Sequence, residues 1–170
     1  MRTGGYAPAF RSSKNIKELL AGPKGSNYTN NDTLPSGCFK CSSKCDLCKN
    51  YFRESKIFRS SSTECFYINR QHVDCKTKNV IYLVTYNKCK VQNVGSTSNE
   101  FKVRFRNHKS AMSTKKTTCE VAVHFNEEKH QLSDFEFIVI EQICNIDDKH
   151  NDGKRLITRE AFLCSHLRTL

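Results

Sequence analysis

The chain has 170 residues, enough for one domain of ordinary size plus an appendage. Its net charge is +11, no apolar run approaches the ~18–20 residues that span a bilayer, and the N-terminus has no apolar signal region. These features argue against a membrane or secreted protein and indicate an intracellular chain. The charge favours a polyanion such as nucleic acid as partner, with a solvated basic surface as the alternative.

A flexible basic linker is predicted over residues 1–37, which are rich in Gly, Ser, Asn and Pro. Only residues 14–21 have helical spacing, which predicts one short helix there. Residues 1–79 carry 14 Lys and Arg against 6 Asp and Glu, whereas residues 80–170 carry 14 against 11. The basic linker therefore makes RNA a candidate partner besides DNA.

A Cys-rich, partly irregular linker is predicted over residues 38–75, where FRSSSTECFYINRQHVDC indicates a short strand pair. In CFKCSSKCDLC two CxxC pairs suit zinc, because a turn within each pair aims both thiolates at one ion; free or buried thiols are the alternative. Three residues between the pairs are few for a single four-thiolate site, so Cys65 or Cys75 is the alternative for completing it. The predicted zinc ligands are Cys38, Cys41, Cys45, Cys48 and Cys75.

Residues 76–170 have the pattern of a packed α+β domain, with a small three-stranded antiparallel sheet flanked by helices. Thr97 and Glu100 form a predicted capping box at the start of the first helix. The third strand, FEFIVIEQI, is apolar on nearly every residue, which predicts a central place in the sheet. The predicted elements are strands over residues 80–86 and 90–96, helices over 98–112 and 119–126, a strand over 135–143 and a helix over 153–170.

Polar side chains occur at positions that need an explanation. Arg104 and His108 are four residues apart and share a helix face. In the last helix Glu160 lies within an apolar stripe, and burying a carboxylate alone is costly. Glu160 therefore requires a cation or a metal beside it; the alternative is a glutamate at the rim, paired with Arg159 or a lysine.

The segments VIYLVTY, NVGSTSNEFKVRFRNHKSAM, VAVHFNEEKHQLSDFEFIVIEQI and REAFLCSHLRTL follow the order strand, strand, helix, helix, strand, helix. Over about residues 75–170 the chain thus resembles the GIY-YIG nuclease superfamily, most closely the endonuclease domain of Penelope-like retroelements. Upstream, FRSSKNIKELLAG and GCFKCSSKCDLCK are similar to the linker that precedes this domain in those elements. The resemblance implies a nuclear location and a reverse transcriptase domain in the same polyprotein.

The resemblance implies metal-dependent nicking of DNA, which would supply a 3′ hydroxyl for reverse transcription. Tyr82 would position or deprotonate the attacking water, and Arg104 would bind the scissile phosphate. His108 would act in proton transfer, and Glu160 would hold a single Mg²⁺ or Mn²⁺ ion. The strand position of Tyr82 and the helix position of Arg104 are also ordinary places for a packing residue and a surface residue.

Two departures from the family pattern concern the catalytic residues. Asn93 replaces the second signature tyrosine, and Val80 replaces the first signature glycine. Asn is too short to reach where a phenol would, so Asn93 is expected to impair the site. The alternative function is therefore a catalytically inactive, nucleic-acid-binding zinc module derived from such an element.

The resemblance also implies a second zinc site, made in the family by two cysteines and two later histidines. Here Cys89, His124 and His130 remain, and Tyr86 stands where the other cysteine would be. Cys119, five residues before His124, is a candidate to replace it.

Substrate grip is expected mainly from basic side chains on the first helix of the domain. Phosphate contacts of this kind give salt-dependent affinity with little sequence choice. The predicted DNA-binding residues are Lys102, Arg104, Arg106 and Lys109.

Overall fold

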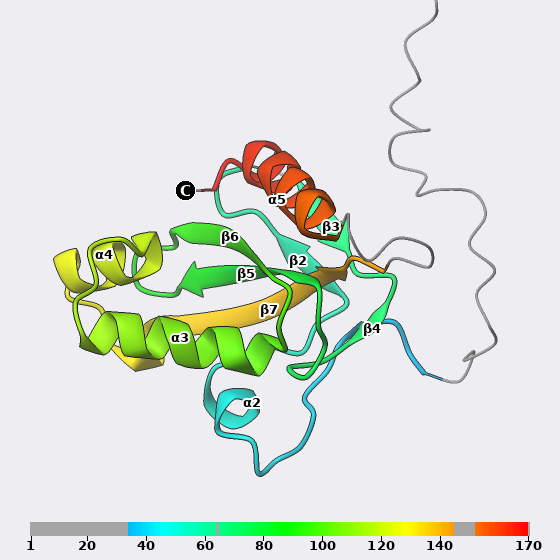
Figure 1. The fold of residues 1–170 in the computed structure, drawn as a ribbon, viewed down its shortest axis with the longest axis horizontal. Helices are drawn as coiled ribbons and strands as arrows, with labels where there is room; N and C mark the ends of the chain where they lie inside the picture. Colours follow the sequence, from blue (N-terminus) through cyan, green and yellow to red (C-terminus); the bar gives the residue numbers. More distant parts are fainter. Residues whose placement is uncertain (1–33, 64, 145–151, 170) are drawn as a thin grey trace, which may run out of the picture. The chain divides into compact units, whose positions relative to one another are not determined.

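The computed structural model describes residues 34–63, 65–144 and 152–169, and these form a mixed α+β structure (Figure 1). β-branched and aromatic residues build a three-stranded antiparallel sheet in the order β6-β5-β7. Two helices cover one face of this sheet and one helix covers the other (Figure 1). The elements are β5 (Val80–Tyr86), β6 (Gln92–Thr97), β7 (Phe135–Gln142), α3 (Phe101–Ser113), α4 (Glu120–Glu127) and α5 (Asp152–Leu167).

The two faces of the sheet follow from the alternation of side chains along β5 and β6. Tyr82 pairs with Gly95 and Val84 with Asn93, on the face covered by α3 and α4. Ile81 pairs with Ser96, on the face covered by α5. The sheet therefore divides the polar residues of β6 between two helical layers.

Smaller elements precede the sheet. The predicted strand pair within residues 38–75 is confirmed by β2 and β3, which pair antiparallel, and a further pair, β1 and β4, runs parallel. A short helix, α2, lies between β1 and β2 in the chain. These elements are β1 (Gly37–Cys38), α2 (Asp46–Asn50), β2 (Ile57–Arg59), β3 (Phe66–Ile68) and β4 (His72–Val73), and a 3₁₀ turn, η1 (Leu132–Asp134), precedes β7.

The Cys-rich segment packs onto β7 and shares one hydrophobic core with the sheet. Phe137 N donates to Tyr51 O over 2.7 Å, and Arg53 N donates to Phe137 O over 2.8 Å. The prediction that FEFIVIEQI is the central strand is wrong, because β5 lies between β6 and β7. β7 is apolar on nearly every residue although it is an edge strand of the sheet, because this segment packs against it.

The capping box predicted at Thr97 and Glu100 does not form. β6 continues through Thr97, which pairs with Val80, so α3 begins three residues later with Glu100 as its N-cap. The Thr97 hydroxyl instead accepts a hydrogen bond from Asn99 N over 3.2 Å. Pairing in the sheet thus overrides the local helix-start signal.

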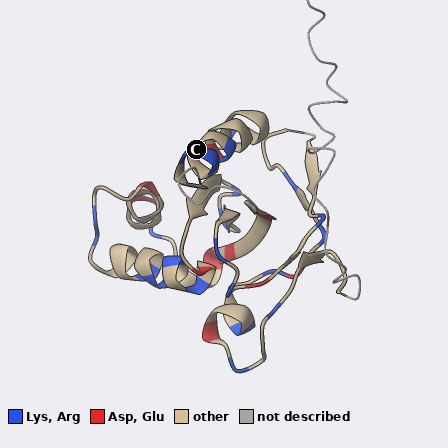
Figure 2. Cartoon of the chain, turned by 45° about the vertical axis from the view of Figure 1, so that its right-hand side comes forward, with Lys and Arg blue, Asp and Glu red and all other residues tan. Residues whose placement is uncertain are grey.

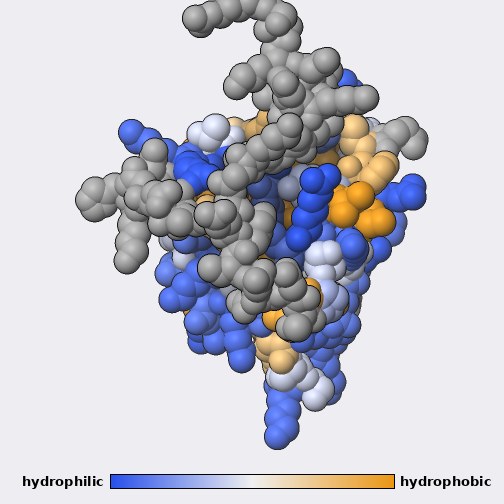
Figure 3. Space-filling model, turned by 90° about the vertical axis from the view of Figure 1, so that its right-hand side faces the viewer, coloured by the Kyte–Doolittle hydropathy of each residue, from blue (hydrophilic) through white to orange (hydrophobic). Residues whose placement is uncertain are grey.

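Of the linker predicted over residues 1–37, residues 1–33, with the predicted helix at 14–21, lie outside the described residues. Across the described ranges, no helix is long and apolar enough to cross a membrane. The surface seen in Figure 3 is mostly hydrophilic, with apolar side chains in small groups. The large apolar residues that remain exposed include Ile57, Phe66 and Ile68 on the β2–β3 pair and Ile157 and Phe162 on α5.

Candidate functional site

Three of the predicted catalytic side chains converge between β5 and α3. Arg104 Nε donates to the Tyr82 hydroxyl oxygen over 2.9 Å, and that oxygen lies 2.8 Å from His108 Nε2. Both Tyr82 and His108 are buried, at 1% and 3% exposure, whereas Arg104 is half-buried. The one-turn spacing of Arg104 and His108 on α3 brings both to the same phenol.

Electrostatics in this group favour neutral side chains next to one fixed cation. Burial raises the pKa of Tyr82, although Arg104 acts in the opposite direction. Burial and then the Arg104 charge lower the pKa of His108 to about 4. At neutral pH His108 is therefore an uncharged imidazole, which has one nitrogen available as a proton acceptor.

Gly95 is required by the Tyr82 ring, because the two residues face each other in the sheet. A Cβ atom at Gly95 would lie 2.5 Å from the Tyr82 hydroxyl oxygen and 2.6 Å from the ring carbon that bears it. Since the ring is held between β5 and α3, it has no room to move away. The glycine of NVG therefore sets where the phenol lies.

Glu160 lies on the other helical layer and is held by β6. The Ser96 hydroxyl donates to Glu160 Oε2 over 2.5 Å, and both residues are half-buried. The charge of Glu160 contributes to the raised pKa of Tyr82, so the carboxylate acts on the phenol across the edge strand. Carboxylate and hydroxyl oxygens are ligands that Mg²⁺ and Mn²⁺ accept. Arg159, the alternative partner of Glu160, binds Glu141 Oε2 over 2.8 Å instead.

Asn93 lies on the same face of the sheet as Tyr82, two residues from Gly95. It is buried, at 8% exposure. A larger side chain at this position would point toward the layer of α3 and α4, so Asn93 belongs to the same layer as the phenol.

A four-thiol group lies beside α2. The Sγ atoms of Cys41, Cys45, Cys48 and Cys75 all lie within 4.8 Å of one another, and three of the separations are 3.3, 3.7 and 3.9 Å. These separations are close to the ~3.8 Å edge of a tetrahedron with Zn–S bonds of about 2.3 Å. Burial raises the pKa of Cys48 to about 11 and also raises that of Cys75, so a bound cation must displace their protons. The four thiols can hold a metal ion such as zinc.

Cys38 is set apart from this group, which corrects its prediction as a zinc ligand. The period-2 alternation of β1 turns its side chain into the core, where Val139 N donates to its Sγ over 3.4 Å. Burial raises the pKa of Cys38 to about 12, which suits a buried neutral thiol. Cys75, and not Cys65, completes the four-thiol group, because the chain returns past α2 just before β5.

Cys89, His124 and His130 form a second, three-membered group. Cys89 Sγ lies 3.3 Å from His124 Nε2 and 3.4 Å from His130 Nε2. Burial and the neighbouring His130 lower the pKa of His124, which favours the neutral imidazole that binds metals. His130 Nδ1 makes no hydrogen bond within the described residues, and the nearest carboxylate oxygen, Asp134 Oδ2, lies 3.6 Å away and accepts from Gln131 N.

Tyr86 does not act as a fourth member of this group. Its ring packs against both imidazoles, at centroid distances of 4.5 Å to His124 and 5.1 Å to His130. Its hydroxyl donates to Val121 O over 2.9 Å. The Tyr86 ring therefore packs beside the three donor atoms and supplies no ligand. A tetrahedral metal ion held by these atoms would take its fourth ligand from outside the group.

The prediction that Cys119 replaces the missing cysteine is wrong. Cys119 is the N-cap residue of α4 and its Sγ lies 3.8 Å from His108 Nδ1, beside Tyr82 and Arg104. It is not a member of the group with His124 and His130. Cys119 precedes His124 by five residues, which is more than one helical turn. Its side chain therefore lies beside His108 and not beside His124.

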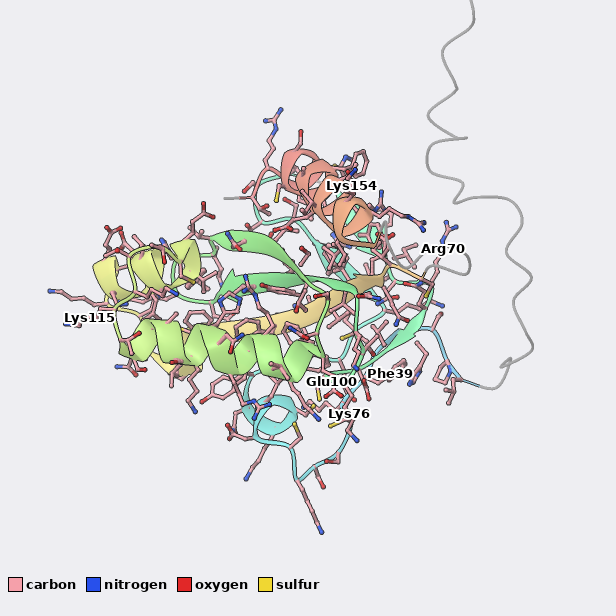
Figure 4. The ribbon with its side chains drawn as sticks, viewed as in Figure 1. Phe39, Arg70, Lys76, Glu100, Lys115 and Lys154 are labelled. Carbon is pink, nitrogen blue, oxygen red and sulfur yellow. The ribbon has the colours of Figure 1, made fainter. Side chains whose placement is uncertain are left out.

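The predicted DNA-binding side chains do not share one face of α3. At about 100° per residue, Lys102, Arg106 and Lys109 lie together, and Arg104 is about 200° from Lys102. Lys102 Nζ binds Glu100 Oε2 over 2.8 Å at the end of α3 where Lys76 also lies, and Lys109 Nζ lies 3.9 Å from an α2 carboxylate (Figure 4).

Basic residues occur on α5 as well as α3 (Figure 2). The basic flank of α3, defined as Lys102, Arg106 and Lys109, faces the four-thiol group. Arg104 faces the phenol. A polyanion on this flank would thus contact a different side of α3 from the group of Tyr82, Arg104 and His108.

Ser96 and Asp134 were not identified from the sequence. Ser96 follows Gly95 on a strand in which most residues are polar, so its hydroxyl did not stand out in the sequence. Asp134 follows His130 by four residues, a spacing that indicates a supporting carboxylate.

Searches of family models, curated proteins and solved structures found no match to this chain.

Proposed function

We propose that this chain is a metal-dependent endonuclease that nicks DNA, with the GIY-YIG type of active site and, as in Penelope-like retroelements, zinc-stabilised surroundings. The observation that supports this best is the Tyr82–Arg104–His108 group, which combines a phenol, a fixed cation and a neutral imidazole within hydrogen-bond distance. Tyr82 and His108 are buried and Arg104 is half-buried, so the three side chains are held together in one place. Glu160, held by Ser96 across the edge strand, adds the oxygen ligands that a divalent ion needs.

The hydrogen-bond roles of Arg104, Tyr82 and His108 set the direction in which a proton can be transferred. Arg104 Nε can only donate, so the Tyr82 oxygen is an acceptor there and its own proton points to His108 Nε2. In the proposed reaction the Tyr82 oxygen takes a proton from water as its hydroxyl proton passes to His108 Nε2. The phenol thereby avoids the phenolate form, which burial disfavours.

The attacking water oxygen forms a bond to phosphorus, and the bond from phosphorus to the 3′ oxygen breaks. The leaving 3′ oxygen takes a proton from bulk water, so the products are a 3′ hydroxyl and a 5′ phosphate. The Arg104 guanidinium offsets the charge that develops on the phosphate oxygens. A divalent ion at Glu160 would polarise the phosphate and stabilise the leaving oxygen.

The two metal-binding groups are proposed as structural zinc sites. Four thiols at tetrahedral spacing fit Zn²⁺ closely, and the Cys89, His124 and His130 group fits it with one external ligand. In this role zinc ties α2 to the segment before β5, and ties the β5–β6 turn to α4. Neither group lies at the Tyr82 hydroxyl.

A second candidate function is favoured by Asn93. If a second phenol is needed to orient water or phosphate, its absence lowers the rate by on the order of 10²–10³, by analogy with the loss of one preorganised donor. The chain would then be a DNA-binding zinc module that cleaves poorly. Both functions share the fold and differ only in turnover.

A plasmid-nicking assay with Mg²⁺ or Mn²⁺ tests the proposal. Wild type is compared with Glu160→Gln, with Asn93→Tyr, and with the matched control Glu127→Gln on the exposed side of α4. Nicking by wild type and Glu127→Gln, lowered on the order of 10²-fold in Glu160→Gln, supports the nuclease. Binding of DNA without nicking by wild type, restored in Asn93→Tyr, supports the binding module; equal nicking by Glu160→Gln and wild type refutes the metal site.

A further inference from the structure

Cys119 has no role in the reaction proposed above, yet its thiol lies against the outer nitrogen of the imidazole. Cys119 Sγ is 3.8 Å from His108 Nδ1, whereas the other ring nitrogen, Nε2, faces Tyr82. Cys119 is partly buried and fixed as the N-cap of α4, where its carbonyl accepts hydrogen bonds from Ala122 N and Val123 N. The thiol is therefore held in place by a rigid helix end.

The imidazole has two neutral tautomers, and only one of them gives the buried Tyr82 hydroxyl proton an acceptor within the group. With the proton on Nδ1, His108 donates to Cys119 Sγ and accepts the Tyr82 hydroxyl proton at Nε2. With the proton on Nε2, His108 would donate to a Tyr82 oxygen that already accepts Arg104 Nε–H. The Tyr82 hydroxyl proton would then need another acceptor in a buried place, which is costly.

We propose that Cys119 is a positioning residue that holds His108 in the Nδ1–H tautomer, so that Nε2 is available for the proton of Tyr82. The catalytic part of this inference rests on the proposed nuclease function, but the tautomer itself does not. A sulfur acceptor suits the position because it sustains a long hydrogen bond without placing a full charge beside Arg104.

Two substitutions distinguish the role of the Cys119 sulfur as a hydrogen-bond acceptor from the effect of its volume. Cys119→Ala removes the acceptor, whereas Cys119→Ser keeps an acceptor of smaller radius at the same place. Cys119 belongs to neither metal-binding group, so the zinc content of both variants is expected to equal that of wild type. Thermal melting of both variants shows whether they fold like wild type.

The tautomer is read by nitrogen NMR of the full chain labelled with ¹⁵N-histidine, with the His108 signals assigned from a His108→Gln sample. Wild type is expected to show a protonated, pyrrole-type Nδ1 and a pyridine-type Nε2 at neutral pH. Cys119→Ala should shift population toward the Nε2–H form, and Cys119→Ser should largely restore the wild-type pattern. A wild-type Nε2–H tautomer, or an unchanged tautomer in Cys119→Ala, overturns the inference.

Steady-state nicking provides the second readout. Cys119→Ala should lower kcat roughly tenfold with KM unchanged, since one net hydrogen bond of orientation is lost, and Cys119→Ser should recover most of it. If Cys119→Ala shifts the tautomer but nicks as fast as wild type, the positioning role fails. If wild type nicks no DNA while the tautomer is as expected, the proposed function fails and the tautomer assignment stands.

Discussion

His108 makes the stability of the chain depend on pH in a way that follows from its surroundings. Burial, with a smaller contribution from the Arg104 charge, lowers its pKa to about 4 in the folded chain. The unfolded chain has the ordinary value of about 6.5. Between these values the unfolded state binds a proton that the folded state does not, so stability falls as the pH falls.

The gap between the two pKa values corresponds to about 3 kcal/mol of unfolding free energy. This stability is fully present above the unfolded pKa and is lost as the pH falls through the folded pKa. Between about pH 7 and about pH 5 the linkage relation gives a loss of about 2 kcal/mol from His108 alone. A loss of this size is a large part of the stability of a domain of this length.

Urea unfolding at those two pH values measures this contribution. Wild type is compared with His108→Gln, which removes the titrating group, and with His166→Gln, which removes a histidine that lies exposed on α5. Wild type and His166→Gln should lose about 2 kcal/mol more than His108→Gln on acidification. The same pH dependence in all three chains would show that His108 titrates normally, and the reasoning from its burial would be refuted.

Three further predictions concern the phenol, the thiols and the basic flank of α3. Gly95→Ala should destabilise the chain by about 1–3 kcal/mol in urea unfolding and reduce nicking, because its methyl group meets the buried phenol; wild-type stability and rate would contradict this. Cys41→Ser should lower the bound zinc measured by mass spectrometry, whereas the matched change Cys65→Ser should leave it unchanged; equal zinc in both would exclude the four-thiol site. Arg106→Gln should reduce the salt dependence of DNA binding by about one phosphate contact, while Lys115→Gln, at the far end of α3, should not; equal slopes would remove this flank from the DNA interface.

The sheet and its helices could be predicted because their signals are periodic. VIYLVTY is β-branched and aromatic on nearly every residue, which predicts a buried strand, and the observed β5 spans the predicted residues 80–86. The last helix was predicted over residues 153–170 and observed over Asp152–Leu167, because its apolar stripe has the helical period. The predicted start of α3 was wrong because strand pairing competed with the local helix-start signal: Thr97 pairs with Val80 in the sheet.

Which cysteines converge could not be predicted from spacing. CFKCSSKCDLC places four cysteines close in sequence, but the strand alternation at Cys38 turns one thiol into the core. Its place is taken by Cys75, 27 residues after Cys48 by residue number, and such a return depends on how the chain crosses β7. The contact of Cys119 with His108 was missed for the same reason, since it depends on the packing of α4 on α3.

The neighbouring residues Gly95 and Ser96 explain how two layers of helices can act at one place. Because successive residues of a strand point to opposite faces, Gly95 meets the phenol of Tyr82 and Ser96 meets the carboxylate of Glu160. β6 is an edge strand of the three-stranded sheet, and its two successive residues connect the layer of α3 with the layer of α5. A deletion of one residue before Gly95 would place Ser96 against the ring, whereas an insertion there would place Val94 against the ring and Gly95 opposite Glu160. The one-residue register of β6 therefore decides which of its residues meets the phenol and which meets the carboxylate in the proposed site.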